Sequence, residues 1–118
     1  MTIRRPLRLA RRSKYGAIRV TVDGYQFDSK REALRYQYLK LRHLAGEIAN
    51  LEVHPAYTLI VNGVKIGKVT LDFRYIDLLN RGAQVVEDAK SPATHKARDW
   101  MLRKKLLKAI HGVDVQEV

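Results

Sequence analysis

The sequence predicts an α/β (α+β) fold with a central mixed β-sheet flanked by helices, and three observations support this prediction. Asp-Gly at 23–24 and Asn-Gly at 62–63 lie between alternating apolar runs, as in tight β-hairpins. Two longer stretches, 29–45 and 94–111, have apolar residues at helical spacing, and each is followed by a glycine. The length of 118 residues suits one domain with an adequate core.

The first predicted elements are a hairpin and a helix. A two-residue turn at Asp23-Gly24 creates two cross-strand pairs on one face. These pairs are Val22 with Tyr25 and Val20 with Phe27. A helix then begins at Ser29 and runs to about Ala45, with Gly46 as its C-cap. The apolar stripe expected to face the core consists of Leu34, Tyr38, Leu41 and Ala45.

A second hairpin follows a linker that contains His54-Pro55. Its predicted strands are residues 57–61 and 64–66, on either side of Asn62-Gly63. The apolar positions change parity at Gly67, and this change predicts a β-bulge there.

The third predicted hairpin contains the candidate site residues. Runs at 70–76 and 83–90 are typical of strands, and the turn Asn80-Arg81-Gly82 lies between them. This register places Asp72 opposite Asp88, with Lys90 two residues further on the same face. Glu87 falls on the opposite face by strand alternation, and we interpret it as structural.

The C-terminal part is predicted to form a helix and a last strand. Ser91-Pro92 ends the preceding strand, and Ser91 or Thr94 caps a helix that runs to about His111 before Gly112. The expected core residues of this helix are Trp100, Leu107 and Ile110. Residues 113–118 alternate in polarity and predict the final strand.

The net charge of +11 is unevenly distributed and predicts an anionic partner. Residues 1–16 carry six basic and no acidic side chains, and residues 91–112 carry six basic side chains against Asp99 alone. Residues 17–90 contribute only +2. This segregation favours a nucleic acid over an acidic membrane or protein, and residues 1–14 are predicted to form a flexible basic arm before a domain at 15–118.

Several classes of protein are excluded or disfavoured by composition. The chain has no cysteine, which excludes disulfides, thiolate zinc sites and cysteine nucleophiles. No apolar run approaches the ~20 residues of a membrane span, and the start lacks the apolar segment of a secretory signal. We therefore expect a cytoplasmic protein without a membrane partner.

Asp72 and Asp88 supply the oxygen ligands that Mg²⁺ prefers, and Mn²⁺ is expected to substitute. Such a metal lowers the pKa of bound water and stabilises a leaving oxygen, while Lys90 can orient the attacking water or neutralise charge on phosphate. The alternative interpretation is an Asp–Lys pair at a sheet edge. Because that alternative must also account for two carboxylates on central strands, we favour the metal site.

Glu32 is a third candidate ligand with a strong local alternative. Ser29-x-x-Glu32 matches a capping box, in which the glutamate binds the backbone at the start of the helix. By spacing alone, the capping role is the better interpretation. The four histidines have no metal-ligand spacing among them, and His95 is the one that follows the strand of Lys90.

The ordered motifs nevertheless resemble the PD-(D/E)xK nuclease superfamily, and in particular small phage-encoded nuclease-like proteins. The matching segments are Lys14-Tyr15-Gly16, Phe27 to Ala33, Asp72 to Tyr75 and Val86 to Lys90. A helix glutamate ahead of the strand motifs is also similar to archaeal-type Holliday junction resolvases. The resemblance covers residues 14–118, and it departs from the commoner pattern in having Asp88 where a glutamate is more frequent.

The resemblance implies a restriction-endonuclease-like domain of phage or bacterial origin. It implies that Glu32, Asp72 and Asp88 bind Mg²⁺ and that Lys90 is catalytic, in a DNA endonuclease that is structure-selective for branched DNA or nonspecific. By analogy with resolvases it suggests a homodimer. The alternative is a non-catalytic nucleic-acid-binding protein on the same scaffold. The predicted phosphate contacts are Arg4, Arg5, Arg8, Arg11, Arg12 and Lys14 in the arm and Lys96, Arg103 and Lys104 near the second helix.

Overall fold

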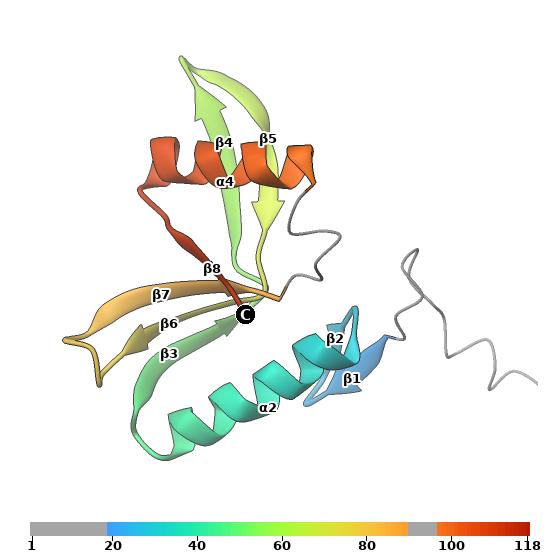
Figure 1. The fold of residues 1–118 in the computed structure, drawn as a ribbon, viewed down its shortest axis with the longest axis vertical. Helices are drawn as coiled ribbons and strands as arrows, with labels where there is room; N and C mark the ends of the chain where they lie inside the picture. Colours follow the sequence, from blue (N-terminus) through green and yellow to red (C-terminus); the bar gives the residue numbers. More distant parts are fainter. Residues whose placement is uncertain (1–18, 90–96) are drawn as a thin grey trace, which may run out of the picture. The chain divides into compact units, whose positions relative to one another are not determined.

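The computed structural model describes residues 19–89 and 97–118. The basic arm, Lys90, Lys96 and the predicted caps Ser91 and Thr94 lie outside the described residues. The chain divides into two compact units, residues 1–38 and 39–118, and the boundary falls inside helix α2 (Lys30–Leu44). The predicted α+β class is confirmed, with two described helices, a mixed sheet and an N-terminal hairpin (Figure 1).

The N-terminal hairpin of the first unit has the predicted register. Strands β1 (Val20–Val22) and β2 (Tyr25–Phe27) are antiparallel, with Val20 opposite Phe27 and Val22 opposite Tyr25. Both turn residues have positive φ, 52° at Asp23 and 82° at Gly24. This is the conformation of a tight two-residue turn, which aspartate and glycine adopt readily.

Helix α2 starts and ends as its capping residues predict. The backbone N–H of Glu32 donates to Oγ of Ser29 at 3.2 Å, which satisfies one donor in the first turn. At the other end Gly46 has φ of 76°, and the N–H of Glu47 donates to the carbonyl of Arg42 at 2.9 Å.

The predicted buried stripe of α2 is wrong. Leu34, Tyr38 and Leu41 are 65%, 49% and 66% exposed, and Ala45 is exposed as well. The buried residues are instead Ala33, Tyr36 and Leu39. Within the first unit the ring of Tyr36 packs 5.3 Å from that of Phe27, and its hydroxyl donates to Asp23 at 2.8 Å. Two apolar stripes run along this helix, and tertiary contacts select the one that carries Tyr36.

A four-stranded mixed sheet forms the centre of the second unit, in the order β3-β6-β7-β8. Its strands are β3 (Ile48–Val53), β6 (Phe73–Asp77), β7 (Ala83–Asp88) and β8 (Val115–Glu117). The first two pairings are antiparallel, and β8 runs parallel to β7, as expected for a last strand after a crossover helix.

Strand β3 was not predicted, because residues 47–56 were interpreted as a linker. Its pairing with β6 is interrupted between Ala49 and Glu52, and Asn50 has φ of 54°. A bulge of this kind disturbs the alternation of polar and apolar residues on which strand prediction depends.

The hairpin of β4 (Ala56–Val61) and β5 (Val64–Thr70) forms a separate two-stranded sheet. The predicted bulge is confirmed: the register shifts between the pairs Leu59–Gly67 and Ile60–Lys65, so Ile66 is the extra residue. The turn at Asn62-Gly63 is also as predicted.

Helix α4 (Arg98–His111) packs against this hairpin. The described helix begins after Ala97, which has extended φ and ψ and makes no side-chain cap. The end at Gly112, with φ of 69°, is confirmed. Trp100 and Leu107 join the buried core with Leu59, Val69, Leu71, Val86 and Val113, and Ile110 packs against it.

Candidate metal centre

The register of β6 and β7 brings two predicted site residues together. The strands pair from Asp77–Ala83 to Phe73–Glu87, which is the predicted hairpin about Asn80. Asp72 and Asp88 follow the last pair of this ladder, Phe73–Glu87, on the two chains. The N–H of Asp72 donates to the carbonyl of Glu87 at 3.2 Å, so the two chains stay adjacent at this point.

Both carboxylates are buried in the end of this hairpin. Asp72 is 8% exposed and Asp88 is 2% exposed. Oδ2 of Asp72 accepts a hydrogen bond from the N–H of Ala89 at 2.6 Å, which holds its carboxylate beside the backbone that follows Asp88. Burying acidic groups is costly unless hydrogen bonds, protons or cations compensate, and the hydrogen bond from Ala89 is one such compensation for Asp72.

His54 is a site residue that the sequence analysis missed. It lies in the turn between β3 and β4, and one ring nitrogen is within 4.8 Å of a carboxylate oxygen of Asp72. Backbone hydrogen bonds support this approach: the N–H of His54 donates to the carbonyl of Asp72, and that of Leu71 to the carbonyl of Pro55, each at 2.9 Å. Within the second unit, His54 and Asp72 offer an imidazole nitrogen and a carboxylate oxygen that could hold a metal ion.

No sequence signal would have identified His54 as a ligand. It lies eighteen residues before Asp72, whereas recognisable ligand motifs place their residues a few positions apart. Its φ of 58° is also unusual, because a residue before proline prefers extended conformations. Positive φ at a non-glycine residue is a form of strain that is frequent at functional sites.

Glu32 takes part in a capping arrangement that differs slightly from the predicted one. Its Oε2 accepts a hydrogen bond from the N–H of Asp28 at 3.3 Å, one residue before the expected partner Ser29. A carboxylate has about four lone-pair sites, so this hydrogen bond is compatible with a metal bond at the same side chain. Within its own unit Glu32 therefore has the predicted local role and retains the chemistry of a ligand.

Glu87 belongs to the other face of the sheet, as alternation predicts. It lies opposite Phe73, is 1% exposed, and accepts a short hydrogen bond from the hydroxyl of Tyr75. This pair supports the structural interpretation of Glu87.

Arg74 adds a fixed positive charge two residues from Asp72 on the same face. Its guanidinium donates to both oxygens of Glu52, at 2.5 and 2.6 Å, and to the hydroxyl of Tyr57 at 3.0 Å. The hydrogen bonds from Arg74 hold the pKa of Glu52 below its ordinary value, and those to Glu52 and Tyr57 raise the pKa of Arg74. Arg74 is thus permanently charged and anchored.

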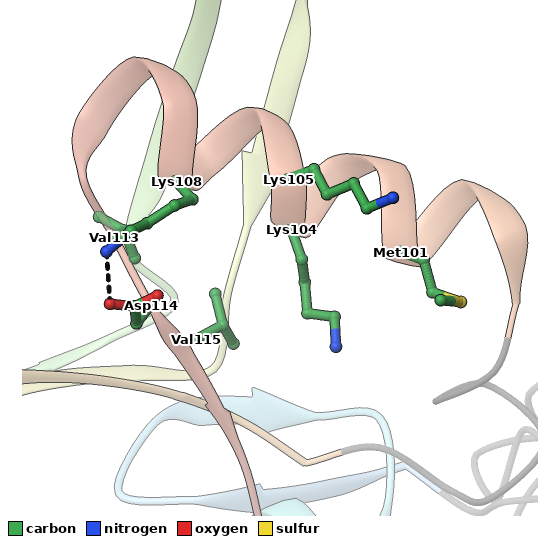
Figure 2. Close-up of a pocket in the computed structure, with 7 residues that line it drawn as sticks. All are labelled: Met101, Lys104, Lys105, Lys108, Val113, Asp114 and Val115. Carbon is green, nitrogen blue, oxygen red and sulfur yellow. Dashed lines mark hydrogen bonds and ion pairs between the residues drawn. The ribbon is translucent and has the colours of Figure 1, made fainter.

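Of the predicted phosphate contacts, Arg103 and Lys104 lie in the described part of α4. Arg103 is exposed, whereas Nζ of Lys104 pairs with Glu117 at 2.8 Å. Lys104 also lines an open hollow of about 330 Å³ between α4 and β8 (Figure 2). The other lining residues are Met101, Lys105, Lys108, Val113, Asp114 and Val115. Because Lys108 pairs with Asp114 at 2.7 Å, the charge of this hollow is partly neutralised.

The fold and these side chains define an α+β protein with a carboxylate and imidazole group that could hold a metal ion. The chain belongs to the family described as Protein of unknown function (DUF1064), whose model matches residues 12–116. No curated protein and no solved structure matches the chain. Neither described helix is long and apolar enough to cross a membrane.

Proposed function

We propose that this protein is a metal-dependent DNA endonuclease with its centre at Asp72 and Asp88. The observation that carries the proposal is the end of the β6–β7 ladder at Phe73–Glu87, which is followed on the two chains by two buried carboxylates, Asp72 and Asp88. Burying acidic groups in one region is costly, and a divalent cation offsets that cost.

The donor set fits a divalent metal and favours some ions over others. Asp72, Asp88 and Glu32 offer the oxygen atoms that suit Mg²⁺, whereas the imidazole of His54 suits Mn²⁺ and the later transition metals better. We therefore propose that Mn²⁺ supports activity at least as well as Mg²⁺. When bound, such a metal supplies an activated water and stabilises the leaving oxygen of a phosphodiester.

The residues of the chain supply positioning and proton transfer. The N–H of Ala89 orients the carboxylate of Asp72. Lys90 follows Asp88 at the spacing that keeps both on one face of an extended strand, where its ammonium group can neutralise charge on phosphate or orient the attacking water. The basic segments at 1–16 and 91–112 would hold the DNA backbone.

The resemblance to the PD-(D/E)xK superfamily supports the same assignment. It accounts for Glu32, Asp72, Asp88 and Lys90 together, and it favours branched or nonspecific DNA as the substrate. A non-catalytic DNA-binding protein remains the alternative, which the net charge of +11 supports equally well. The two proposals differ in the role of the metal: the nuclease needs a divalent ion to cleave DNA, whereas the binding protein needs none to bind it.

The decisive experiment is cleavage of labelled junction, flap, single-stranded and duplex DNA with Mg²⁺ or Mn²⁺. We expect Asp88→Asn to reduce cleavage at least about 100-fold, because it removes a ligand charge next to the reacting phosphate. DNA binding in EDTA should be retained. Asp114→Asn is the matched control, because Asp114 is an exposed carboxylate on the β8 side of the hollow. Absence of cleavage by the wild type on all substrates would refute the enzyme and leave the binding protein.

A further inference from the structure

The β4–β5 hairpin has a rigid base and an apolar tip. At the base, Leu59 and Val69 are 3% exposed and pack with Trp100 and Leu107 of α4. In Figure 1 the tip of the hairpin extends past α4. The two strands pair from the base to the turn, apart from the bulge at Ile66, so the tip is held to the core through this ladder.

The tip exposes aliphatic side chains that lack a partner in the described part of the chain. Val61 and Val64 form the last pair before the turn and are 36% and 63% exposed. By strand alternation Val61 is on the same face as buried Leu59, so the apolar face continues beyond the helix that covers it. Ile60 and the bulged Ile66 are 49% and 55% exposed.

The charge of this hairpin is wholly positive. Residues 56–70 contain Lys65 and Lys68 and no acidic side chain. Both lysines are exposed, and neither forms an ion pair with any residue that the structure describes. An apolar tip with flanking lysines is complementary to exposed bases between phosphates, and less so to a neutral protein groove.

We propose that the β4–β5 tip is a wedge that enters DNA at a branch point, where the continuous stack of a single duplex is interrupted. The inference rests on the proposed DNA substrate and adds the origin of its selectivity. Aliphatic side chains can insert between base steps at the cost of unstacking them, and that cost is lowest where stacking is already interrupted. Val61 and Val64 would contact the bases, and Lys65 and Lys68 the flanking phosphates.

The test compares a four-way junction with a linear duplex of the same sequence, bound in EDTA so that cleavage plays no part. The wedge variant is Val61→Thr with Val64→Thr, which keeps β-branched side chains of similar size and so preserves the strands. The matched control is Leu78→Thr with Leu79→Thr, because these residues are 51% and 70% exposed at another hairpin turn of the same unit.

We expect the wild type to bind the junction at least about 10-fold more tightly than the duplex, which corresponds to about 1.4 kcal/mol. The wedge variant should lose most of this ratio, and the control should keep it. The fluorescence of 2-aminopurine at the branch point should rise with the wild type and not with the wedge variant. Lys65→Gln with Lys68→Gln should weaken both complexes equally and lower the salt slope by up to about 1.8.

Several outcomes would overturn the wedge. These are a wild type without junction preference, a wedge variant that keeps both the preference and the fluorescence signal, or a variant whose only defect is loss of self-association in sedimentation. Failure of the nuclease proposal is distinguishable from failure of the wedge, because the nuclease is tested by cleavage with a divalent metal and the wedge by binding in EDTA. A protein that never cleaves DNA but loses junction preference in the wedge variant supports the wedge and refutes the enzyme.

Discussion

His54 shows how a single residue can have a role that its neighbours in sequence do not indicate. Its backbone is strained, with φ of 58° before a proline, and its ring lies beside Asp72. Strain of this kind costs about 1–3 kcal/mol and persists only where the surrounding structure compensates. The position of the imidazole relative to Asp72 gives a reason for the strain to be kept.

Replacing His54 by glycine should therefore have opposite effects on stability and on metal binding. In EDTA, His54→Gly should raise the melting temperature, because glycine adopts positive φ without strain. It should also reduce the rise in melting temperature that Mn²⁺ produces, because a ligand is lost. His54→Ala should reduce the metal effect in the same way without the gain in stability. A Mn²⁺ effect unchanged in both variants would exclude His54 as a ligand.

Glu32 is a residue for which local rules and the resemblance point to different roles, and Asp88 is one at which the chain departs from the commoner motif. Glu32 has the capping role that Ser29-x-x-Glu32 predicts, although its partner is the N–H of Asp28. Asp88 is buried at the predicted register position, and its side chain is one methylene shorter than the glutamate that is commoner there. Cleavage by the Asp88→Asn variant, described above, tests this residue first.

At the scale of elements, Tyr36 connects α2 to the first hairpin. Burial and the hydrogen bond to Asp23 raise the pKa of the Tyr36 hydroxyl to about 12. The folded state therefore holds this proton more tightly than the unfolded chain, whose tyrosines titrate near 10. The resulting stability is complete below about pH 10 and is lost as the pH rises through 12, because the unfolded state releases the proton first.

We expect Tyr36→Phe to remove this loss of folding stability at alkaline pH. Near pH 8 the variant should be less stable by about 1 kcal/mol, because it lacks one hydrogen bond. Between about pH 10 and 12 the difference should shrink. The free energy of unfolding is measured by urea unfolding, followed by circular dichroism, near pH 8 and again between about pH 10 and 12. Tyr38→Phe is the control, because Tyr38 is an exposed tyrosine of the same helix. A constant difference across this range would contradict the assigned cause.

At the scale of the whole molecule, we propose that the segregated charge is the main determinant of DNA binding. Residues 1–13 contain five arginines, and deleting them should weaken DNA binding and flatten its salt dependence. Each lost phosphate contact lowers the slope of log K against log salt by about 0.9 for duplex DNA. Replacing the five arginines by lysines is the matched control and should preserve most of the slope. An unchanged slope after deletion would show that the arm does not contact phosphates.

Local signals in the sequence predicted the tight turns of the three hairpins and the C-terminal ends of both helices. Asp23-Gly24, Asn62-Gly63 and the turn about Asn80 are local signals, since a tight turn sets the pairing of the residues beside it. For this reason the β6–β7 hairpin, which precedes Asp72 and Asp88 at its open end, was predictable.

Only the tertiary structure decided which face of α2 is buried, that β3 exists, and that His54 lies beside Asp72. Each of these features depends on contacts between separate elements. The packing of Tyr36 on Phe27 selects the buried face of α2. Strand β6 pairs with β3, whose bulge interrupts the alternation by which a strand is recognised in sequence. The backbone hydrogen bonds of His54 and Leu71 then bring an imidazole to a carboxylate eighteen residues away. Local propensities carry no information about such contacts, because they arise only when the whole chain minimises its exposed apolar surface and satisfies its backbone groups.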